Sequence, residues 1–201
     1  MAENFEVNRP AMGEVSEWVN QFKIFWTRKL DALENFLHNE SMKTGKRKSI
    51  KKKKMTDTPL TIERVLNAPV NKVWKAITDV NEMAQWYFKL DNFKPEVGFE
   101  FRFYGGTEEK QYLHICEVTE VVPQKKLTYS WRYDGYPGIS FVTFELFAEG
   151  AATIIKLTHT GLESFPSATD PNFAVKSFTE GWTFIIGKSL KEYVEREGYA
   201  S

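Results

Sequence analysis

The sequence predicts an α+β fold in which a curved antiparallel sheet wraps around one long C-terminal helix. Two short helices are expected after the first strand, and a separate amphipathic helix at the N-terminus. Three observations predict this fold: alternating apolar residues in the middle of the chain, short turn signals between the alternating segments, and helical periodicity at both ends. Because the turns are short, neighbouring strands must be antiparallel.

The main domain opens with one strand and two short helices. Alternation over residues 61–66 predicts the strand, and Pro69 marks a helix start because proline is tolerated in the first helical turn. The apolar face of this helix is formed by Val70, Val73, Trp74 and Ile77. Asp79 and Glu82 have the spacing of a capping box, which predicts a second short helix. It should carry Met83, Trp86 and Tyr87.

Five alternating segments then predict a meander of strands. In the first of them Phe99, Phe101 and Phe103 share one face, and the glycine pair at 105–106 is expected to end the strand. The others cover residues 111–122, 125–133, 139–149 and 151–160, with Pro and Gly turn signals between them. The more apolar face should be the inner, concave one. Its expected members are Leu127, Tyr129, Trp131, Val142, Phe144, Leu146, Ile155, Leu157 and His159.

The concave face needs a helical cover, because no further strands follow. Residues 173–197 supply it, with apolar side chains at helical spacing: Phe178, Trp182, Ile185, Ile186, Leu190 and Val194. A helix of about 25 residues spans roughly the length of a small domain. The polar loop over residues 161–172 leads into this helix and suits a lid.

The N-terminal segment has a different character. A helix that begins at Glu14 and ends at His38 would present an aromatic stripe, which needs either a second copy or the main domain as its partner. Residues 39–57 are lysine-dense and read as a linker, either a solvated spacer or an electrostatic attachment to nucleic acid or anionic lipid. The expected organisation is an N-terminal helix in residues 1–38, a linker in 39–57 and a domain in 58–201.

Composition and charge restrict the class of protein. At 201 residues, 42% apolar and 15% aromatic, the chain suits one well-cored domain plus an appendage. Cys116 is the only cysteine, which excludes an intramolecular disulfide. Residues 39–55 hold eight basic side chains and one acid, leaving 19 basic and 26 acidic elsewhere, so the main domain should not bind nucleic acid. With neither a secretory signal pattern nor a membrane-span pattern, a cytoplasmic location is expected.

The order of elements and several local motifs resemble the START-like, helix-grip superfamily, also called SRPBCC. The opening run over residues 61–79, with Trp86 after it, is similar to the branch named after the activator of the heat-shock-protein-90 ATPase. The segments 127–131, 142–146, 157–161 and Gly181-Trp182 fit the same branch in the same order. The resemblance covers about residues 58–197. It implies a cavity for a lipid-like or polycyclic molecule and, by the branch name, chaperone stimulation and a role in stress responses.

The N-terminal helix resembles something else. Pro10, Trp18, Trp26 and the segment 30–34 look like the last helix of ArsR-type winged-helix repressors, which in that family helps to form dimers. No helix-turn-helix or wing fits before Glu14, so independent DNA binding is not expected. A homodimer through residues 14–38 is the partner that the resemblance suggests.

Motifs for catalysis or metals are missing from the sequence: no P-loop, no GxGxxG after a strand, no HExxH, no CxxC and no GxSxG. His114 and Cys116 on one strand face supply two ligands at most, fewer than the roughly four of a structural zinc site, so neither a metal nor a cofactor is expected. His159 is either a pocket acid or base or a core histidine with satisfied hydrogen bonds.

An aromatic cavity between sheet and helix is the leading site hypothesis, because aromatic walls with few polar groups are typical of ligand pockets. The expected ligand-binding residues are Phe101, Tyr129, Trp131, Phe144, Leu157, His159, Phe178, Trp182 and Ile185. His159 or Tyr129 would orient an apolar small molecule. Two alternatives stay open: a cyclase or hydrolase that uses His159 in the same cavity, and a protein-interaction module related to co-chaperones. Filling of the cavity by Trp131 and Trp182 would count against all ligand roles.

Overall fold

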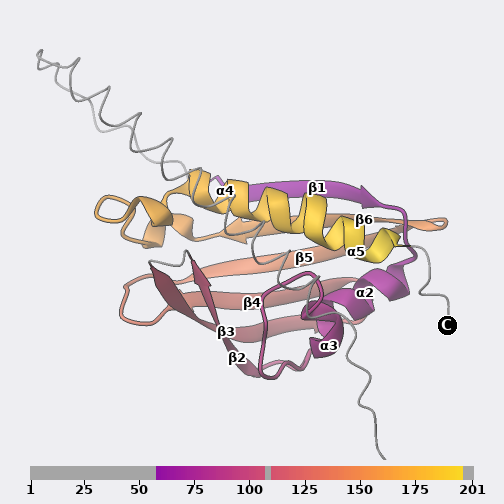
Figure 1. Ribbon diagram of the computed structural model, residues 1–201, viewed down its shortest axis with the longest axis horizontal. Helices are drawn as coiled ribbons and strands as arrows, with labels where there is room; N and C mark the ends of the chain where they lie inside the picture. The colour runs from indigo at the N-terminus through magenta and orange to yellow at the C-terminus, as the bar shows by residue number, and fades with distance from the viewer. Residues whose placement is uncertain (1–57, 107–109, 197–201) are drawn as a thin grey trace, which may run out of the picture. The chain divides into compact units, whose positions relative to one another are not determined.

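The sheet has six strands around which the rest of the fold is arranged. The structure, a computed structural model, describes residues 58–106 and 110–196, so the predicted N-terminal helix and lysine-rich linker lie outside the described residues. The strands are β1 (Leu60–Leu66), β2 (Glu100–Gly106), β3 (Gln111–Val122), β4 (Lys126–Tyr133), β5 (Ser140–Glu149) and β6 (Ala152–Thr160). Their order is β1-β6-β5-β4-β3-β2 (Figure 1). The predicted antiparallel α+β architecture is thereby confirmed.

Strand register brings the predicted inner residues into rows across the sheet. One row joins Leu127 to Phe144, Phe144 to Leu157 and Leu157 to Ile62, and all four side chains are buried. The next row joins Tyr129, Val142, His159 and Leu60 in the same way. Alternate residues of antiparallel strands point to one face, so each row places four buried side chains on the concave side.

Two short helices follow β1, as predicted. The first of them buries a different set of residues from the one expected. Helix α2 (Val70–Thr78) starts one residue after Pro69, which is its N-cap. Its buried residues are Val73, Ala76 and Ile77, while Trp74 and Val70 are only half-buried. The apolar stripe is therefore narrower than the sequence pattern suggested, and Trp74 lies at its margin.

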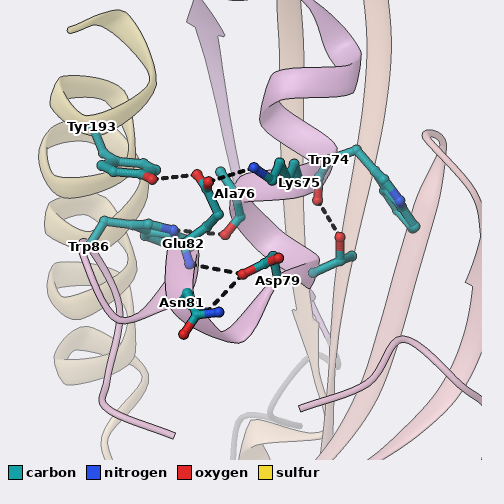
Figure 2. Close-up of polar contacts among 9 residues, drawn as sticks. Trp74, Lys75, Ala76, Asp79, Asn81, Glu82, Trp86 and Tyr193 are labelled. Carbon is teal, nitrogen blue, oxygen red and sulfur yellow. Dashed lines mark hydrogen bonds and ion pairs between the residues drawn. The ribbon is translucent and has the colours of Figure 1, made fainter. Parts of the chain in front are cut away.

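The expected capping box before helix α3 (Val80–Met83) is half formed. Asp79 Oδ1 accepts hydrogen bonds from the backbone N–H groups of Asn81 at 2.9 Å and Glu82 at 3.2 Å. The Glu82 side chain does not close the box but turns to Lys75 Nζ, 2.9 Å away, and accepts a hydrogen bond from the Tyr193 hydroxyl (Figure 2). The Glu82 carboxylate thus links α3 to both α2 and the C-terminal helix.

The prediction that Trp86 and Tyr87 lie on the second short helix is wrong. Helix α3 is only one turn long and ends at Met83, so both residues follow it. Both are nevertheless buried, with Trp86 at 1% and Tyr87 at 2% exposure. The Trp86 indole N–H donates to the carbonyl of Ala76 at 2.9 Å (Figure 2). A side-chain bond back to α2 holds this non-helical segment against the core.

The glycine pair that was expected to end this strand does so, because Gly105 and Gly106 are the last two residues of β2. Gly105 is buried, and a Cβ atom there would lie 2.9 Å from Cε1 of His114 and 3.1 Å from Cε1 of Phe88. The glycine is thus needed for the close approach of two rings.

The C-terminal helix is continuous but not uniform. It consists of α4 (Val175–Phe184), a π-helical stretch η3 (Ile185–Leu190) and α5 (Lys191–Glu195). It begins two residues later than predicted, because Pro171–Phe173 forms the separate 3₁₀ turn η2 and Ala174 is the N-cap. Figure 1 shows this helix along β1 and β6, on the concave side of the sheet.

Candidate functional site

The nine predicted ligand-binding residues all lie in the interior between sheet and C-terminal helix. Their exposures are 8% or less, and Leu157 and His159 are fully buried. Phe101 comes from β2, Tyr129 and Trp131 from β4, Phe144 from β5, Leu157 and His159 from β6, and the remaining three from the helix. Ile185 opens the π-helical stretch.

Aromatic rings fill the space between sheet and helix. The rings of Trp131 and Trp182 meet edge to face with centroids 5.5 Å apart, and Phe144 contacts Trp182 at 6.0 Å. Phe101 contacts Tyr129 at 5.2 Å, and Tyr129 lies 5.9 Å from Phe144. Of these four pairs, the one between Tyr129 and Phe144 is tilted and the other three are edge-to-face. Aromatic pairs of the edge-to-face kind add about 0.5–1.5 kcal/mol each beyond area burial. Trp131 of the sheet and Trp182 of the helix are therefore in contact, which is the filling that the sequence analysis named as evidence against a ligand site.

A chain of hydrogen bonds runs through the aromatic interior around His159. The Trp182 indole N–H donates to His159 Nδ1 at 3.0 Å, and His159 Nε2 lies 2.7 Å from Ser140 Oγ. Ser140 is fully buried and donates in turn to the carbonyl of Trp131 at 3.4 Å. Helix, β6, β5 and β4 are joined by this one network.

The partner of Nδ1 determines the tautomer of His159. An indole nitrogen can only donate, so His159 Nδ1 must be the unprotonated acceptor and Nε2 carries the hydrogen. His159 therefore donates to Ser140 and cannot remove its proton. Burial lowers the pKa of His159 from 6.5 to about 3, which keeps the ring neutral at physiological pH. This arrangement corresponds to the core histidine with both hydrogen bonds satisfied.

Tyr129, the other residue expected to orient a ligand, is already paired. Its hydroxyl lies 3.2 Å from the hydroxyl of Tyr87, and both rings are buried. Burial is the main cause that raises the pKa of each phenol well above 10. Both phenols are therefore neutral, and one of them donates a hydrogen bond that the other accepts.

His114 is a second buried histidine, which sequence reasoning considered only as a metal ligand. Its ring stacks on Phe103 with centroids 4.4 Å apart, and Nδ1 donates to the carbonyl of Tyr112 at 3.0 Å. Burial lowers its pKa to about 3, against the raising effect of backbone carbonyls. Burial also raises the pKa of the neighbouring Cys116 thiol. Among residues 58–106 and 110–196, no group of three His, Cys, Asp or Glu is placed to hold a metal ion.

The indole N–H of Trp131 has no hydrogen-bond partner, the one such buried side-chain nitrogen or oxygen in the described part of the chain. The Trp131 ring is 4% exposed and lies among Phe103, His114, Tyr133 and Trp182. Burial raises the pKa of the Tyr133 phenol, and a side-chain hydrogen-bonding interaction with Trp131 opposes that rise, although the Trp131 N–H does not reach the geometry of a full hydrogen bond. An unsatisfied buried donor costs about 1–3 kcal/mol, so this atom calls for an explanation.

A second aromatic cluster, not predicted from the sequence, closes the end of the interior next to Tyr133. Phe165 and Phe173 contact Tyr133 at 5.2 Å and 4.9 Å, so the polar loop expected as a lid anchors two buried rings. The Tyr112 hydroxyl donates to buried Asp170 at 2.7 Å and ties β3 to this loop. Tyr133 continues the alternation of Tyr129 and Trp131, a signal that was available.

Comparison with known proteins identifies relatives of the described region. The family described as Activator of Hsp90 ATPase homolog 1-like protein matches residues 67–195, more than half of the chain. No curated protein matches the chain. No described helix is both long enough and apolar enough to cross a membrane.

Solved structures share the fold. DynU16, from the dynemicin biosynthetic locus, is 25% identical with a TM-score of 0.57 over 69% of this chain, and the match spans 48% of DynU16. MLL2253 from Mesorhizobium loti is 25% identical with a TM-score of 0.57, covering 70% of this chain and 99% of its own. BH1534 from Bacillus halodurans is 26% identical with a TM-score of 0.53, covering 69% of this chain and 97% of its own. The predicted START-like fold is confirmed by these matches.

Proposed function

Since the chain belongs to the family of Activator of Hsp90 ATPase homolog 1-like proteins, we propose that it binds an apolar, ring-containing small molecule between its sheet and C-terminal helix. The observation that carries this proposal is an interior of aromatic rings that includes a buried indole donor without a partner. A core evolved only for stability would gain by satisfying or replacing that donor. The origin of DynU16 in the dynemicin biosynthetic locus agrees with a small-molecule ligand.

Binding requires the interior to rearrange. The Trp131 and Trp182 rings are in contact at 5.5 Å, so a ligand that lies between sheet and helix must turn or displace at least one of them. Trp182 lies three residues before the π-helical stretch that begins at Ile185. π-Helical turns are rare and are frequently found at functional sites, so η3 is where we expect the helix to shift.

The expected affinity follows from the apolar area that a ligand would bury. A three-ring hydrocarbon that loses on the order of 300 Å² of exposed surface gains ~7 kcal/mol at ~25 cal/mol per Å². Part of that gain is offset by the lost freedom of the ligand and by ring rearrangement in the protein. The dissociation constant for a simple aromatic probe should therefore be ten micromolar or weaker.

Indole NMR tests the proposal residue by residue. The chain has six tryptophans, and each contributes one indole N–H signal when labelled with ¹⁵N. Titration with fluorene should move the signals of Trp131 and Trp182, whereas the signal of half-buried Trp74 on α2 should stay in place. Trp74→Phe serves as assignment control and should leave binding unchanged. Fluorene-induced shifts confined to Trp74, or no shifts at saturating fluorene, would exclude the interior site.

The enzymatic alternative has less support from the geometry. A cyclase or hydrolase that uses His159 as general base needs a free ring nitrogen near the substrate, and both nitrogens are occupied by Trp182 and Ser140. The Ser140 hydroxyl is an acceptor from this histidine, so the pair is not arranged as a nucleophile with its base. A co-chaperone role has only the family description behind it.

A further inference from the structure

We propose that Trp131 Nε1 and the Tyr133 hydroxyl together recognise a neutral acceptor oxygen, such as a ketone or quinone carbonyl, on the ring-containing ligand. This inference rests on the proposed function and deepens it by naming the chemical class of the ligand. It also transfers the orienting role from His159 and Tyr129, which the sequence favoured, to two neighbours on the same face of β4.

The first support is the state of the Trp131 donor. Its nitrogen is buried, the residue is 4% exposed, and its interaction with the Tyr133 side chain falls short of hydrogen-bond geometry, so no group of the described chain accepts a full hydrogen bond from it. Buried donors in native proteins are almost always satisfied by protein, ordered water or a bound molecule. Since an indole nitrogen can only donate, the missing partner must be an acceptor.

The second support is that the other interior polar groups are already paired. His159 uses both ring nitrogens, and Tyr129 pairs with Tyr87 at 3.2 Å. His114 donates through Nδ1 to a backbone carbonyl at 3.0 Å. Trp131 Nε1 is thus the buried side-chain nitrogen that is left without a partner in the described part of the chain. An apolar hydrocarbon would leave this donor unsatisfied, and a ligand whose only polar groups are donors would do so as well.

The third support is the placement of Tyr133. It follows Trp131 by two residues on β4, so both side chains project from the concave face, and their ring centroids lie 6.3 Å apart. Burial raises the pKa of the Tyr133 phenol, which keeps it protonated and able to donate. Two neutral donors suit a carbonyl oxygen. A carboxylate would be disfavoured, because both donors are neutral and burial of an unpaired charge is costly.

Fluorene and 9-fluorenone form a matched pair of probes for this test. They share one three-ring frame and differ at the carbonyl oxygen, so the ratio of their dissociation constants isolates recognition of that oxygen. The wild-type chain should bind 9-fluorenone about tenfold more tightly than fluorene, the factor expected for one net hydrogen bond. Trp131→Phe should reduce this preference to within twofold while fluorene affinity changes little. Tyr133→Phe should weaken the preference about threefold.

Phe144→Leu is the matched control, because it changes an interior ring without removing a donor. It should weaken both probes equally and keep their ratio. Fluorene binding by each variant shows that the site is folded. Equal affinity of both probes for the wild type, or an unchanged ratio in Trp131→Phe, would overturn the inference and leave the proposed function standing. If neither probe binds the wild type, the proposed function and the inference fail together.

Discussion

Acidification below about pH 6.5 should strongly destabilise this protein, because two neutral histidines are buried. The loss should begin at a pH higher than that at which most carboxylates titrate. The pKa values of His114 and His159 are lowered by burial from 6.5 to about 3. In the unfolded chain both imidazoles take up a proton near pH 6.5, whereas in the folded chain they do not until about pH 3. The unfolded state therefore binds more protons in this interval, and stability falls as pH falls.

The size of the effect follows from proton linkage. Each proton bound only by the unfolded state changes the free energy of unfolding by ~1.4 kcal/mol per pH unit once the unfolded histidine is fully charged. Between pH 6.5 and pH 5 the two histidines together should remove about 3 kcal/mol, half from each. That is a large share of the ~5–15 kcal/mol that stabilises an ordinary domain. Above pH 7.5 the same groups should produce no slope.

Urea unfolding followed by tryptophan fluorescence measures this slope directly. From pH 6.5 to pH 5 the midpoint should fall by roughly 1–2 M urea. His159→Gln and His114→Asn should each be less stable at pH 7.5, yet each should show about half of the wild-type loss on acidification. A wild-type midpoint that is constant over this range, or single variants with the full wild-type slope, would refute the assignment of both histidines as buried and neutral.

Four further perturbations test the packing and organisation described above. Gly105→Ala places a methyl group 2.9 Å from the His114 ring and should cost about 1–3 kcal/mol by urea unfolding. Tyr193→Phe removes the hydrogen bond to Glu82 and should cost about 1 kcal/mol in the same assay. Trp182→Phe leaves a buried imidazole nitrogen without its donor and should cost about 2–4 kcal/mol with a changed imidazole ¹⁵N spectrum. In sedimentation, a dimer through residues 14–38 predicts twice the monomer mass of 23.4 kDa for the full chain, whereas the chain that starts at Met55 should sediment as a monomer.

Matched variants give these predictions their controls. Lys75→Met removes the other partner of Glu82, but Lys75 is 64% exposed and its loss should cost less than about 0.5 kcal/mol. Phe178→Leu removes an aromatic contact to His159 without a hydrogen bond, and should leave the imidazole spectrum unchanged. If Trp182→Phe lowers the free energy of unfolding no more than Phe178→Leu does, the result argues against the chain of hydrogen bonds around His159. If the full chain sediments as a monomer, the dimer through residues 14–38 is excluded.

The concave face was predictable because apolar and polar side chains alternate with a period of two along β4 and β6. Tyr129 and Trp131 alternate with half-polar neighbours on β4, and Leu157 and His159 alternate on β6, so the faces could be assigned before the register was known. All nine expected site residues are buried on that account. Short turns likewise predicted antiparallel neighbours from local information alone.

The polar connections of the interior were not predictable from pattern. Ser140 meets His159 because β5 pairs with β6 in one register, and a shift of one residue would separate them. Glu82 has the spacing of a capping box, but Tyr193, more than a hundred residues later, competes for its carboxylate. The π-helical stretch over Ile185–Leu190 leaves the apolar periodicity almost unchanged and so gives little signal in sequence.

A crystal structure of the chain grown with 9-fluorenone would test most directly where an apolar ring is held. The three-ring frame should lie between β4 and α4, with the Trp131 or Trp182 ring turned from its present position and the ketone oxygen within hydrogen-bond distance of Trp131 Nε1. Density for the ketone only on the outer surface, with the Trp131 and Trp182 rings still in contact, would show that this interior is a core and not a binding site.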